Sequence, residues 1–422
     1  MKKGKIIIYT ICGVLVVLIA VTLLLIYIES QKRPVIHYQD VSEDGTFSTS
    51  FIRESHLTMN HKNYMISPYS VEIALSMLRD GANGKTQEEL KEVVPERKIK
   101  TLIVQDRVNV ANAVFVKDIY KKDVRDEYIQ TLENQYNAQM IVDPFTTPDK
   151  INQWVDRETN GMIKKILNQM DPQFVIGLAN AVAMEEAWQT PFVCEETKGY
   201  AFTQENGKQY DVSMMSHSFE DNASYYSSED AEAVVLPYIP YNRETGKPAE
   251  FGEEGEQLDF IGILPNDLDS YISSFTLDTI REIEENKKEA SDLYEIYVGL
   301  PRFEYEYDFK KFKSTLRTMG IKSVFDSSSC DLSNMLDNHP DSYVSEAIHK
   351  SYVKVNEEGT KAAAVTYFGV KDMAMPIGDK EYVSIIFDRP FIYMIKDHAS
   401  NEILFFGVVY EPEKWDESKS CK

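Results

Sequence analysis

Six short apolar runs between residues 231 and 409 are the feature that most constrains this chain's fold. Each is rich in β-branched or aromatic residues and bounded by polar or turn-forming residues, which is typical of a β-strand. The runs are 231–236, 258–264, 294–300, 382–387, 391–395 and 403–409. Helical patterns dominate the first third of the globular part instead. Helices mostly first and strands mostly later predict an α+β fold with large sheets.

Two helices are marked by their end residues. Ser70 is expected to cap the first helix and Gly81 to end it. Thr147 and Pro148 are expected to start a second helix, with Gly161 just beyond its end.

Size and charge limit the classes of function. The chain has 422 residues, 43% of them hydrophobic, so it can bury a large core. Its formal net charge is −23. Phosphate binding needs a basic surface, so this charge argues against a nucleic-acid partner. The stretch 241–257 is too polar for a core and is expected to form a surface loop.

The four cysteines, at positions 12, 194, 330 and 421, are sparse and scattered. Cys12 lies in an apolar N-terminal run, which leaves an odd number for the rest of the chain. No C-x-x-C pair suggests zinc. We therefore expect neither a disulfide framework nor a metal site.

The N-terminal run 6–28 has 23 residues without a charge, enough to cross a bilayer. A basic cluster precedes it, and bulky residues stand where a cleaved signal peptide needs small ones. The sequence thus predicts a transmembrane signal anchor at 1–28, a linker at 29–45 and one domain at 46–422. The expected location is the cell membrane, single-pass, with the domain extracellular.

Enzyme signatures are absent from the sequence. Gly84-Lys85-Thr86 resembles the end of a phosphate-binding loop, but Arg79 stands where its first glycine is needed. No G-x-S-x-G elbow or H-E-x-x-H motif occurs, and the seven histidines show no ligand spacing. We expect a protein that is not an enzyme and uses no cofactor.

The segment 356–366 is unusual because small residues follow a glycine. It reads N-E-E-G-T-K-A-A-A-V-T, with Gly359 as a flexible pivot. Taken alone, it predicts a short helix or an alanine-rich strand. Residues 367–379 then mix glycine, methionine, proline and charge without a period, as in an exposed functional loop.

This segment, with Asp388-Arg389-Pro390-Phe391 after it, resembles the hinge and reactive loop of the serpins. Further motifs of that family follow in order along residues 46–414. They are N-Y-M-I-S-P-Y-S at 63–70, G-A-N-G-K-T at 81–86, Asn180-Ala181 with Trp188, Pro191 and Phe192, L-P-R-F at 300–303, Gly320-Ile321 with Phe325, D-L-S at 331–333, and L-F-F-G-V at 404–408. The resemblance implies the serpin fold, with three β-sheets, about eight or nine helices and an exposed reactive-centre loop.

The resemblance also implies a mechanism. A serpin folds into a metastable state whose main sheet can accept one more strand, and a serine protease attacks its exposed loop. The freed hinge inserts into the sheet while the protease is still an acyl-enzyme, which distorts the protease active site. The implied function is irreversible inhibition of serine proteases through a covalent complex.

Insertion turns alternate hinge residues inward, so these must be small or uncharged. The implied inward set carries no charge, whereas Lys361 faces outward. We therefore expect an inhibitory serpin. The implied hinge residues are Glu357, Gly359, Thr360, Ala362, Ala363 and Ala364.

Counting fourteen residues on from Gly359, the usual serpin offset, places the reactive bond at Met373-Ala374. Methionine suits an apolar S1 pocket, so elastase-like, chymotrypsin-like or subtilisin-like proteases are the implied targets. Lys371 stays open as an alternative and would suit a trypsin-like protease if the register slid by two residues.

Other site residues carry over by position. The residues that match the shutter, a hydrogen-bonded cluster beneath the strands that part, are Ser67, Ser70, Asn180 and His349. Trp188 matches the breach at the top of the sheet, where insertion starts. Arg302 and Glu357 match a salt-bridging pair beside the hinge, which is expected to be exposed and to contribute little.

Two departures bear on partners. The segment 93–108 is shorter than in most serpins, which with the acidity argues against a heparin-like activator. The anchor is atypical and suggests a tethered, bacterial, monomeric inhibitor. Two alternatives stay open: a non-inhibitory serpin acting as a binding or chaperone-like module, and an unrecognised enzyme.

Overall fold

A computed structural model describes residues 47–94, 108–136, 138–172, 174–242, 247–249, 255–291, 293–338, 342–345, 347–360 and 380–417. The chain divides into two compact units, residues 1–43 and 44–422, and every described residue belongs to the second. The predicted anchor and linker, the loop 361–379 and the C-terminal residues 418–422 lie outside the described residues.

The prediction of a single-pass protein at the cell membrane is wrong. Among the residues that the structure describes, no helix is long and apolar enough to cross a membrane. The longest of these helices, α3 (Pro68–Gly81), has 14 residues, whereas a crossing needs about 20.

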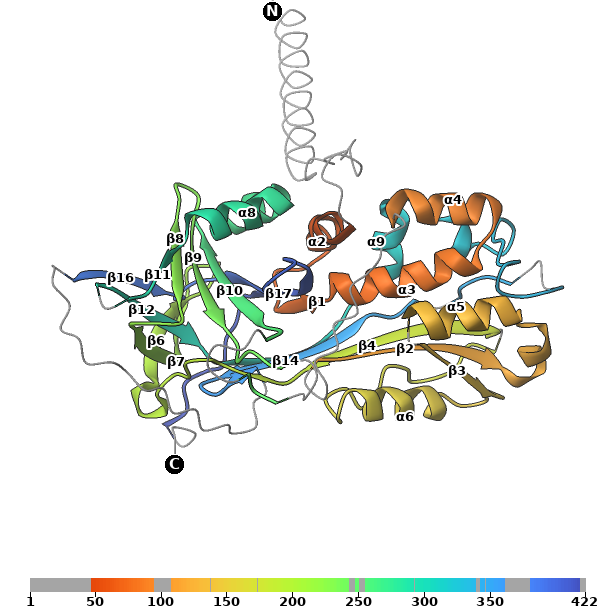
Figure 1. Ribbon diagram of the computed structural model, residues 1–422, viewed down its shortest axis with the longest axis horizontal. Coiled ribbons are helices and arrows are strands. Elements are labelled where there is room, and N and C mark those ends of the chain that lie inside the picture. The colour runs from red at the N-terminus through yellow and green to blue at the C-terminus, as the bar shows by residue number, and fades with distance from the viewer. Residues whose placement is uncertain are drawn as a thin grey trace, which may run out of the picture. The chain divides into compact units, whose positions relative to one another are not determined.

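The predicted α+β class is confirmed (Figure 1). Seven strands form one antiparallel sheet in the order β1-β18-β17-β10-β9-β8-β11. Their bounds are β1 Tyr64–Ile66, β8 Ser224–Ser227, β9 Ala231–Pro237, β10 Leu258–Pro265, β11 Lys288–Glu289, β17 Phe391–Asp397 and β18 Ile403–Val409. Every residue of β10, β17 and β18 is buried, which explains why these runs are mostly apolar rather than alternating. The exceptions are the buried charges Asp259 in β10 and Lys396 and Asp397 at the end of β17.

A second sheet has four strands in the order β16-β12-β7-β6. Their bounds are β6 Lys198–Thr203, β7 Gln209–Phe219, β12 Tyr294–Pro301 and β16 Glu381–Ile386. All six strands predicted from the apolar runs are therefore present in these two sheets, with ends that differ by at most two residues.

The third sheet is divided. One part has the order β3-β2-β4 and the other β13-β14-β15-β5. Their bounds are β2 Val108–Lys117, β3 Ala138–Asp143, β4 Ile176–Met184, β5 Glu186–Ala187, β13 Phe303–Asp308, β14 Lys350–Asn356 and β15 Gly359–Thr360. Only Glu185 separates β4 from β5, so the two parts are one sheet joined at its top.

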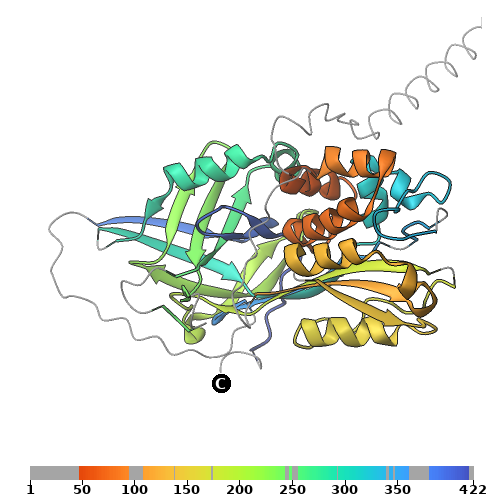
Figure 2. The same cartoon turned by 45° about the vertical axis from the view of Figure 1, so that its right-hand side comes forward.

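Helices cover both faces of this divided sheet. Figures 1 and 2 show α3, α4 and α5 on one face and α6 on the other. The α-helices are α2 Phe47–His56, α3 Pro68–Gly81, α4 Gly84–Val93, α5 Asp126–Tyr136, α6 Asp149–Glu158, α7 Leu268–Ser273, α8 Leu277–Asn286 and α9 Phe312–Thr318. Short 3₁₀ turns are η1 Asp118–Asp123, η2 Cys194–Glu196 and η3 Ser323–Phe325.

The start of α3 differs from the prediction. Ser67, not Ser70, is the N-cap, because its side chain accepts the backbone N–H of Ser70 and Pro68 takes the first helical position. Gly81 ends the helix as predicted, but its role is packing. A Cβ there would lie 2.6 Å from the methyl carbon of Met335.

One cysteine forms a bond that was not predicted from the sequence. Cys194 is disulfide-bonded, and Cys330 is a free, buried cysteine. A single bond is not a disulfide framework, so the expectation that the chain has no such framework stays a prediction.

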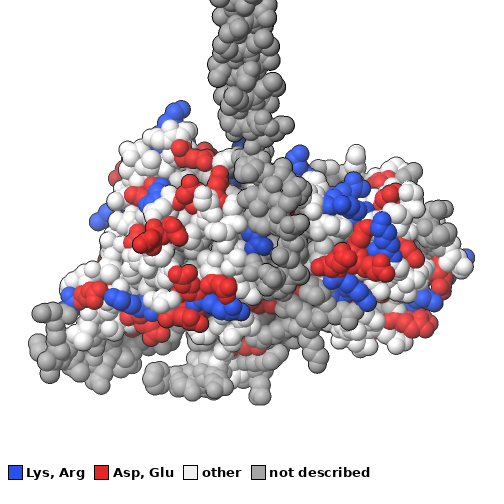
Figure 3. Space-filling view, turned by 90° about the horizontal axis from the view of Figure 1, so that it is seen from above, with Lys and Arg blue, Asp and Glu red and all other residues white. Residues whose placement is uncertain are grey.

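Charged side chains on the face shown in Figure 3 are mixed in sign. There the described acidic and basic groups are interspersed rather than gathered by sign. Among the described residues, this face therefore shows no uniformly basic surface of the kind that binds a polyanion.

Candidate functional site

The division in the third sheet is a place where one more strand fits. β14 pairs with β13 on one side and β4 pairs with β2, but no β-ladder joins β4 to β14 among the described residues. The two strands nevertheless run alongside one another. An added strand would run along the nine residues of β4 and along the part of β14 below Val355 and Asn356, which already pair with β15.

The first two hinge residues already occupy the top of this division. In β15, Gly359 and Thr360 pair with Asn356 and Val355 of β14. On the other side they pair with Ala187 and Glu186 of β5. The hinge is therefore held as the beginning of the missing strand.

Gly359 occupies a backbone conformation that other residues adopt with strain. Its φ is +149°, and a Cβ built there would lie 2.1 Å from the carbonyl oxygen of Glu186. The glycine is thus required by the close approach of β5, and not only as a flexible pivot.

Gly359→Ala is expected to expel β15 from the sheet. Strain of about 1–3 kcal/mol would make amide exchange at residues 359–360 about tenfold faster, measured by hydrogen exchange with mass spectrometry. Gly207→Ala is the matched control, because Gly207 has a φ of +79° with nothing within 4 Å of the new Cβ. Unchanged exchange in Gly359→Ala would contradict the tight approach.

Thr360 forms a hydrogen bond with a buried tyrosine. Its side chain is 4% exposed, and its Oγ1 lies 2.6 Å from the hydroxyl oxygen of Tyr238. Trp188 stacks on Tyr238 with ring centroids 4.7 Å apart, and its Nε1 donates to the carbonyl oxygen of Asn356 at 2.9 Å. Burial raises the pKa of Tyr238 well above its ordinary value, so the hydroxyl stays protonated and able to donate.

A buried ion pair holds the turn that precedes β15. Arg302 contacts both carboxylate oxygens of Glu357, at 2.8 and 2.9 Å from Nε and 2.6 Å from Nη2. The Thr197 hydroxyl donates to the same carboxylate. The side chains of Arg302 and Glu357 are only 14% and 7% exposed, so the expectation of an exposed, weak pair is wrong. The bidentate geometry makes the pair a specific clamp on the turn, and because the pair is buried, removing one partner would leave an uncompensated charge at a high cost in free energy.

Backbone hydrogen bonds also hold this turn. The amide of Trp188 donates to the carbonyl of Glu358, and the amide of Phe192 donates to the carbonyl of Glu357, both at 3.0 Å. The segment that follows β5 therefore holds the turn through two backbone hydrogen bonds.

Below the hinge, His349 contacts the start of α3. Its Nε2 accepts the backbone N–H of Ser67 at 3.0 Å, and the Ser67 hydroxyl donates to the carbonyl of Leu404. Ser70 joins through its N–H to the Ser67 hydroxyl. Asn180 lies in β4, but its side chain is outside the described part of the structure.

The His349 contact predicts a loss of stability in mild acid. Burial lowers the pKa of His349 from 6.5 to about 4, so the unfolded chain binds the proton more readily. The neutral ring contributes stability above pH 6.5, which is lost as the pH falls toward 4 and amounts to about 3 kcal/mol. Urea unfolding midpoints of the native chain and of His349→Asn at pH 7.5 and 4.5 check this. An equal fall in both proteins would contradict it.

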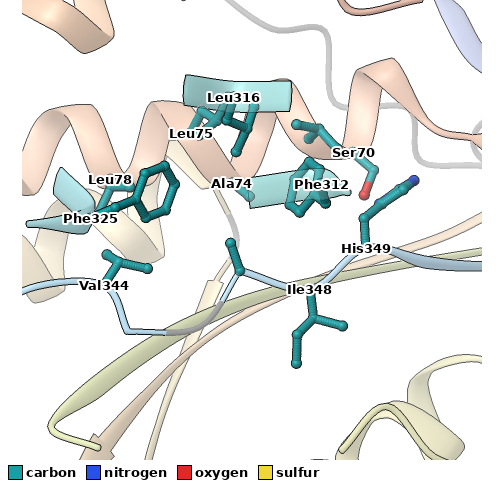
Figure 4. A pocket seen from close by; sticks show the side chains of 12 residues that line it. Ser70, Ala74, Leu75, Leu78, Phe312, Leu316, Phe325, Val344, Ile348 and His349 are labelled. Atoms are coloured by element: carbon teal, nitrogen blue, oxygen red, sulfur yellow. The ribbon is translucent and has the colours of Figure 1, made fainter. Parts of the chain in front are cut away.

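A small cavity of about 60 Å³ lies on the helix side of the division. Figure 4 shows apolar side chains of α3 and α9 around it, with Ser70 and His349 close together at one end. Inward side chains of an added strand would point toward this confined space, so they must be small.

Two residues of the site had no signal in the sequence. Tyr238 follows a predicted strand and looks like any core tyrosine there. The hydroxyl of Ser351, in β14, donates to the carbonyl of Met65 at 2.6 Å. Both act through contacts that join segments more than 100 residues apart.

The stretch 241–257 is more than a surface loop. Tyr241 is 2% exposed, and its amide and carbonyl exchange hydrogen bonds with Glu256. Gln257 then donates to the carbonyl of Tyr238 and to the side chain of Gln189. The base of this stretch therefore supports the tyrosine that holds Thr360.

Several predicted residues have no described position. The hinge residues Ala362, Ala363 and Ala364 and the reactive bond Met373-Ala374 all fall in 361–379, outside the described residues, as does the alternative Lys371. Within the described ranges, no group of three or more metal-ligating side chains is present.

Comparison with known proteins matches most of the chain to one family. The family model described as serpin (serine protease inhibitor) matches residues 42–412. An uncharacterized serpin-like protein of Thermococcus kodakarensis is 29% identical over 408 residues, covering 91% of this chain and 87% of that protein. The leukocyte elastase inhibitor of Bos taurus is 29% identical over 396 residues, covering 86% and 98%. These relatives lend no support to a bacterial source or a membrane location.

Solved structures of serpins have the same fold as this chain. The native state of the thermophilic serpin tengpin superimposes with a TM-score of 0.72 at 27% identity, covering 86% of this chain and 92% of that one. Uncleaved ovalbumin gives a TM-score of 0.68 at 24% identity, covering 87% and 99%, and supports the fold alone.

Proposed function

Because this chain belongs to the serpin family, we propose that it is an irreversible suicide inhibitor of serine proteases. A protease cleaves the loop after residue 360, and the freed hinge enters the divided sheet before the acyl-enzyme is hydrolysed. The protein is consumed in this reaction, so it is not an enzyme, and the reaction uses no cofactor.

One observation carries the proposal. Gly359 and Thr360 are already strand-paired between β14 and β5, at the top of a division that continues between β14 and β4. Insertion extends this short strand downward. Net gains of about 0.5–1.5 kcal/mol per hydrogen bond give on the order of 10 kcal/mol for a dozen residues.

We assign the reactive bond to Met373-Ala374, which suits elastase-like, chymotrypsin-like or subtilisin-like proteases. One relative is a leukocyte elastase inhibitor, which supports an apolar specificity. Cleavage after Lys371 by a trypsin-like protease is the alternative register.

Incubation with elastase, subtilisin and trypsin tests the function. We expect a protease complex that survives a denaturing gel, and a released peptide beginning at Ala374. A released peptide beginning at Asp372 would instead place the reactive bond after Lys371 and contradict the assignment to Met373.

The thermal midpoint of the cleaved chain distinguishes the remaining possibilities. Insertion predicts that the cleaved chain unfolds at a clearly higher temperature than the intact chain. Plain cleavage without complex or rise in midpoint would indicate a non-inhibitory serpin, and turnover of a substrate without consumption would indicate an enzyme.

A further inference from the structure

Three exposed hydrophobic side chains lie together on the second sheet. Leu293 immediately precedes β12, Tyr297 lies in β12 and Tyr382 lies in β16, with exposed fractions of 42%, 39% and 67%. Figure 1 shows β12 and β16 side by side, and the two strands pair in parallel. Single exposed hydrophobic residues are ordinary on a protein surface, whereas a group of them marks a contact surface.

The three side chains share the outer face of the sheet. The residues on either side of Tyr297 are buried, so Tyr297 points outward. Tyr382 pairs with Glu295, two residues before Tyr297, and paired residues of neighbouring strands point to the same side. Leu293 lies two residues before Glu295 and continues the row. We define Leu293, Tyr297 and Tyr382 as the tyrosine face.

Ion pairs form the rim of the tyrosine face. Nζ of Lys380 lies 2.6 Å from Oε2 of Glu295 and 2.7 Å from Oε1 of Glu220, the residue after β7. The same ammonium group lies 5.6 Å from the ring centroid of Tyr382. Protein interfaces commonly have an apolar centre and a polar rim, and tyrosine is among the residues that contribute most to binding. The tyrosine face therefore has the anatomy of a protein-binding surface.

The partner follows from where the face lies along the chain. Lys380 is six residues after Ala374, so a protease that attacks the Met373-Ala374 bond has its active site within about 22 Å of Lys380 along the chain. A folded domain of about 230 residues, an ordinary size for a protease, is about 45 Å across. Its body is therefore large enough to cover the tyrosine face while its active site holds the bond.

We propose that the tyrosine face is a second contact surface for the attacking serine protease, beside the reactive bond. The inference rests on the proposed function, because the loop brings the protease to this face. The rings of Tyr297 and Tyr382 pack against the protease surface in the first, noncovalent complex. They strengthen this complex and so increase the rate of capture.

Binding of an inactive protease tests the contact without the trapping reaction. The probe is elastase whose catalytic serine is replaced by alanine, and the variant carries Tyr297→Thr and Tyr382→Thr. Threonine keeps the preference for a strand, and both positions are exposed, so the fold is retained. We expect the native chain to bind at least about tenfold more tightly than the double variant.

Tyr200→Thr is the matched control for this measurement. Tyr200 is 41% exposed and lies in β6, at the other edge of the same sheet. This variant should bind the inactive elastase as tightly as the native chain. Equal affinities of the native chain and the double variant, or no binding by the native chain, overturn the proposal.

Photochemical crosslinking distinguishes a direct contact from an indirect effect on the loop. The photoreactive residue benzoylphenylalanine replaces the tyrosine at position 297, 382 or 200 of the full chain. We expect crosslinks to the inactive elastase from positions 297 and 382, and none from position 200. Their absence from both 297 and 382 overturns the proposal. A crosslink between two copies of the chain without protease also overturns it, because the face then binds a second copy.

The proposed function and this contact can fail separately. If the inactive elastase shows the difference in affinity and the crosslinks, but active elastase forms no covalent complex, the proposed function fails and the contact stands. If covalent complexes form at the same rate with the native chain and the double variant and no crosslinks appear, the contact is wrong and the proposed function stands.

Discussion

Thr360→Arg is expected to turn the inhibitor into a substrate. Thr360 is 4% exposed between β14 and β5, so an arginine there would have to bury a guanidinium in the space of a threonine. Desolvating this charge and overpacking the site together cost about 3–5 kcal/mol, which slows insertion by more than about a hundredfold. Hydrolysis of the acyl-enzyme would then be faster than insertion of the hinge, and the protease would be released in its active form.

The measurement is the number of inhibitor molecules cleaved for each protease trapped. This ratio should rise by about a hundredfold in Thr360→Arg. Thr360→Ser is the matched control, because it keeps the hydroxyl that contacts Tyr238, and its ratio should stay near that of the native chain. Full trapping by Thr360→Arg would show that the hinge does not enter the sheet.

Arg302→Met is expected to cause a large loss of stability. It removes the partner of Glu357 while the carboxylate stays buried at 7% exposure. Breaking a buried pair in this way costs about 3–5 kcal/mol, so the thermal midpoint of the intact chain should fall by about 5–10 °C. Activity should also decay faster on warming, because the turn before β15 is no longer held.

A double-mutant cycle separates the pair from other effects of the substitution. Arg302→Met with Glu357→Gln removes the buried charge and keeps an acceptor for the Thr197 hydroxyl. The double variant should regain at least half of the lost midpoint. If Arg302→Met unfolds at the same temperature as the native chain, the pair is not a clamp.

The sequence predicted the class of fold and six of its strands, all of them in the first two sheets. Runs such as 258–264 and 403–409 are apolar at nearly every residue because other parts of the fold cover both faces of these strands. An apolar run of this kind can be recognised in the local sequence. The start of α3 was placed three residues too late, because Ser67 and Ser70 are both good caps and only Pro68 between them decides which one is used.

The candidate site was predicted unevenly. His349 and Ser67 meet as the resemblance implied, and Trp188 lies at the top of the divided sheet. The strength of the Arg302–Glu357 pair was misjudged, because exposure depends on what packs around a charge. The contact of Tyr238 with Thr360 joins residues 122 apart in the chain, so no local sequence pattern predicts it.

By itself, the sequence determined that helices mostly come first and strands later, and it placed small residues after Gly359, with the charge of Lys361 on the outward side. Both follow from local periods and side-chain sizes. Only the tertiary structure decided that Gly359 and Thr360 already lie in the sheet, that Glu357 is buried, and that Cys194 is bonded. Burial and pairing are set by segments distant in the chain, and their free energies exist only once those segments meet.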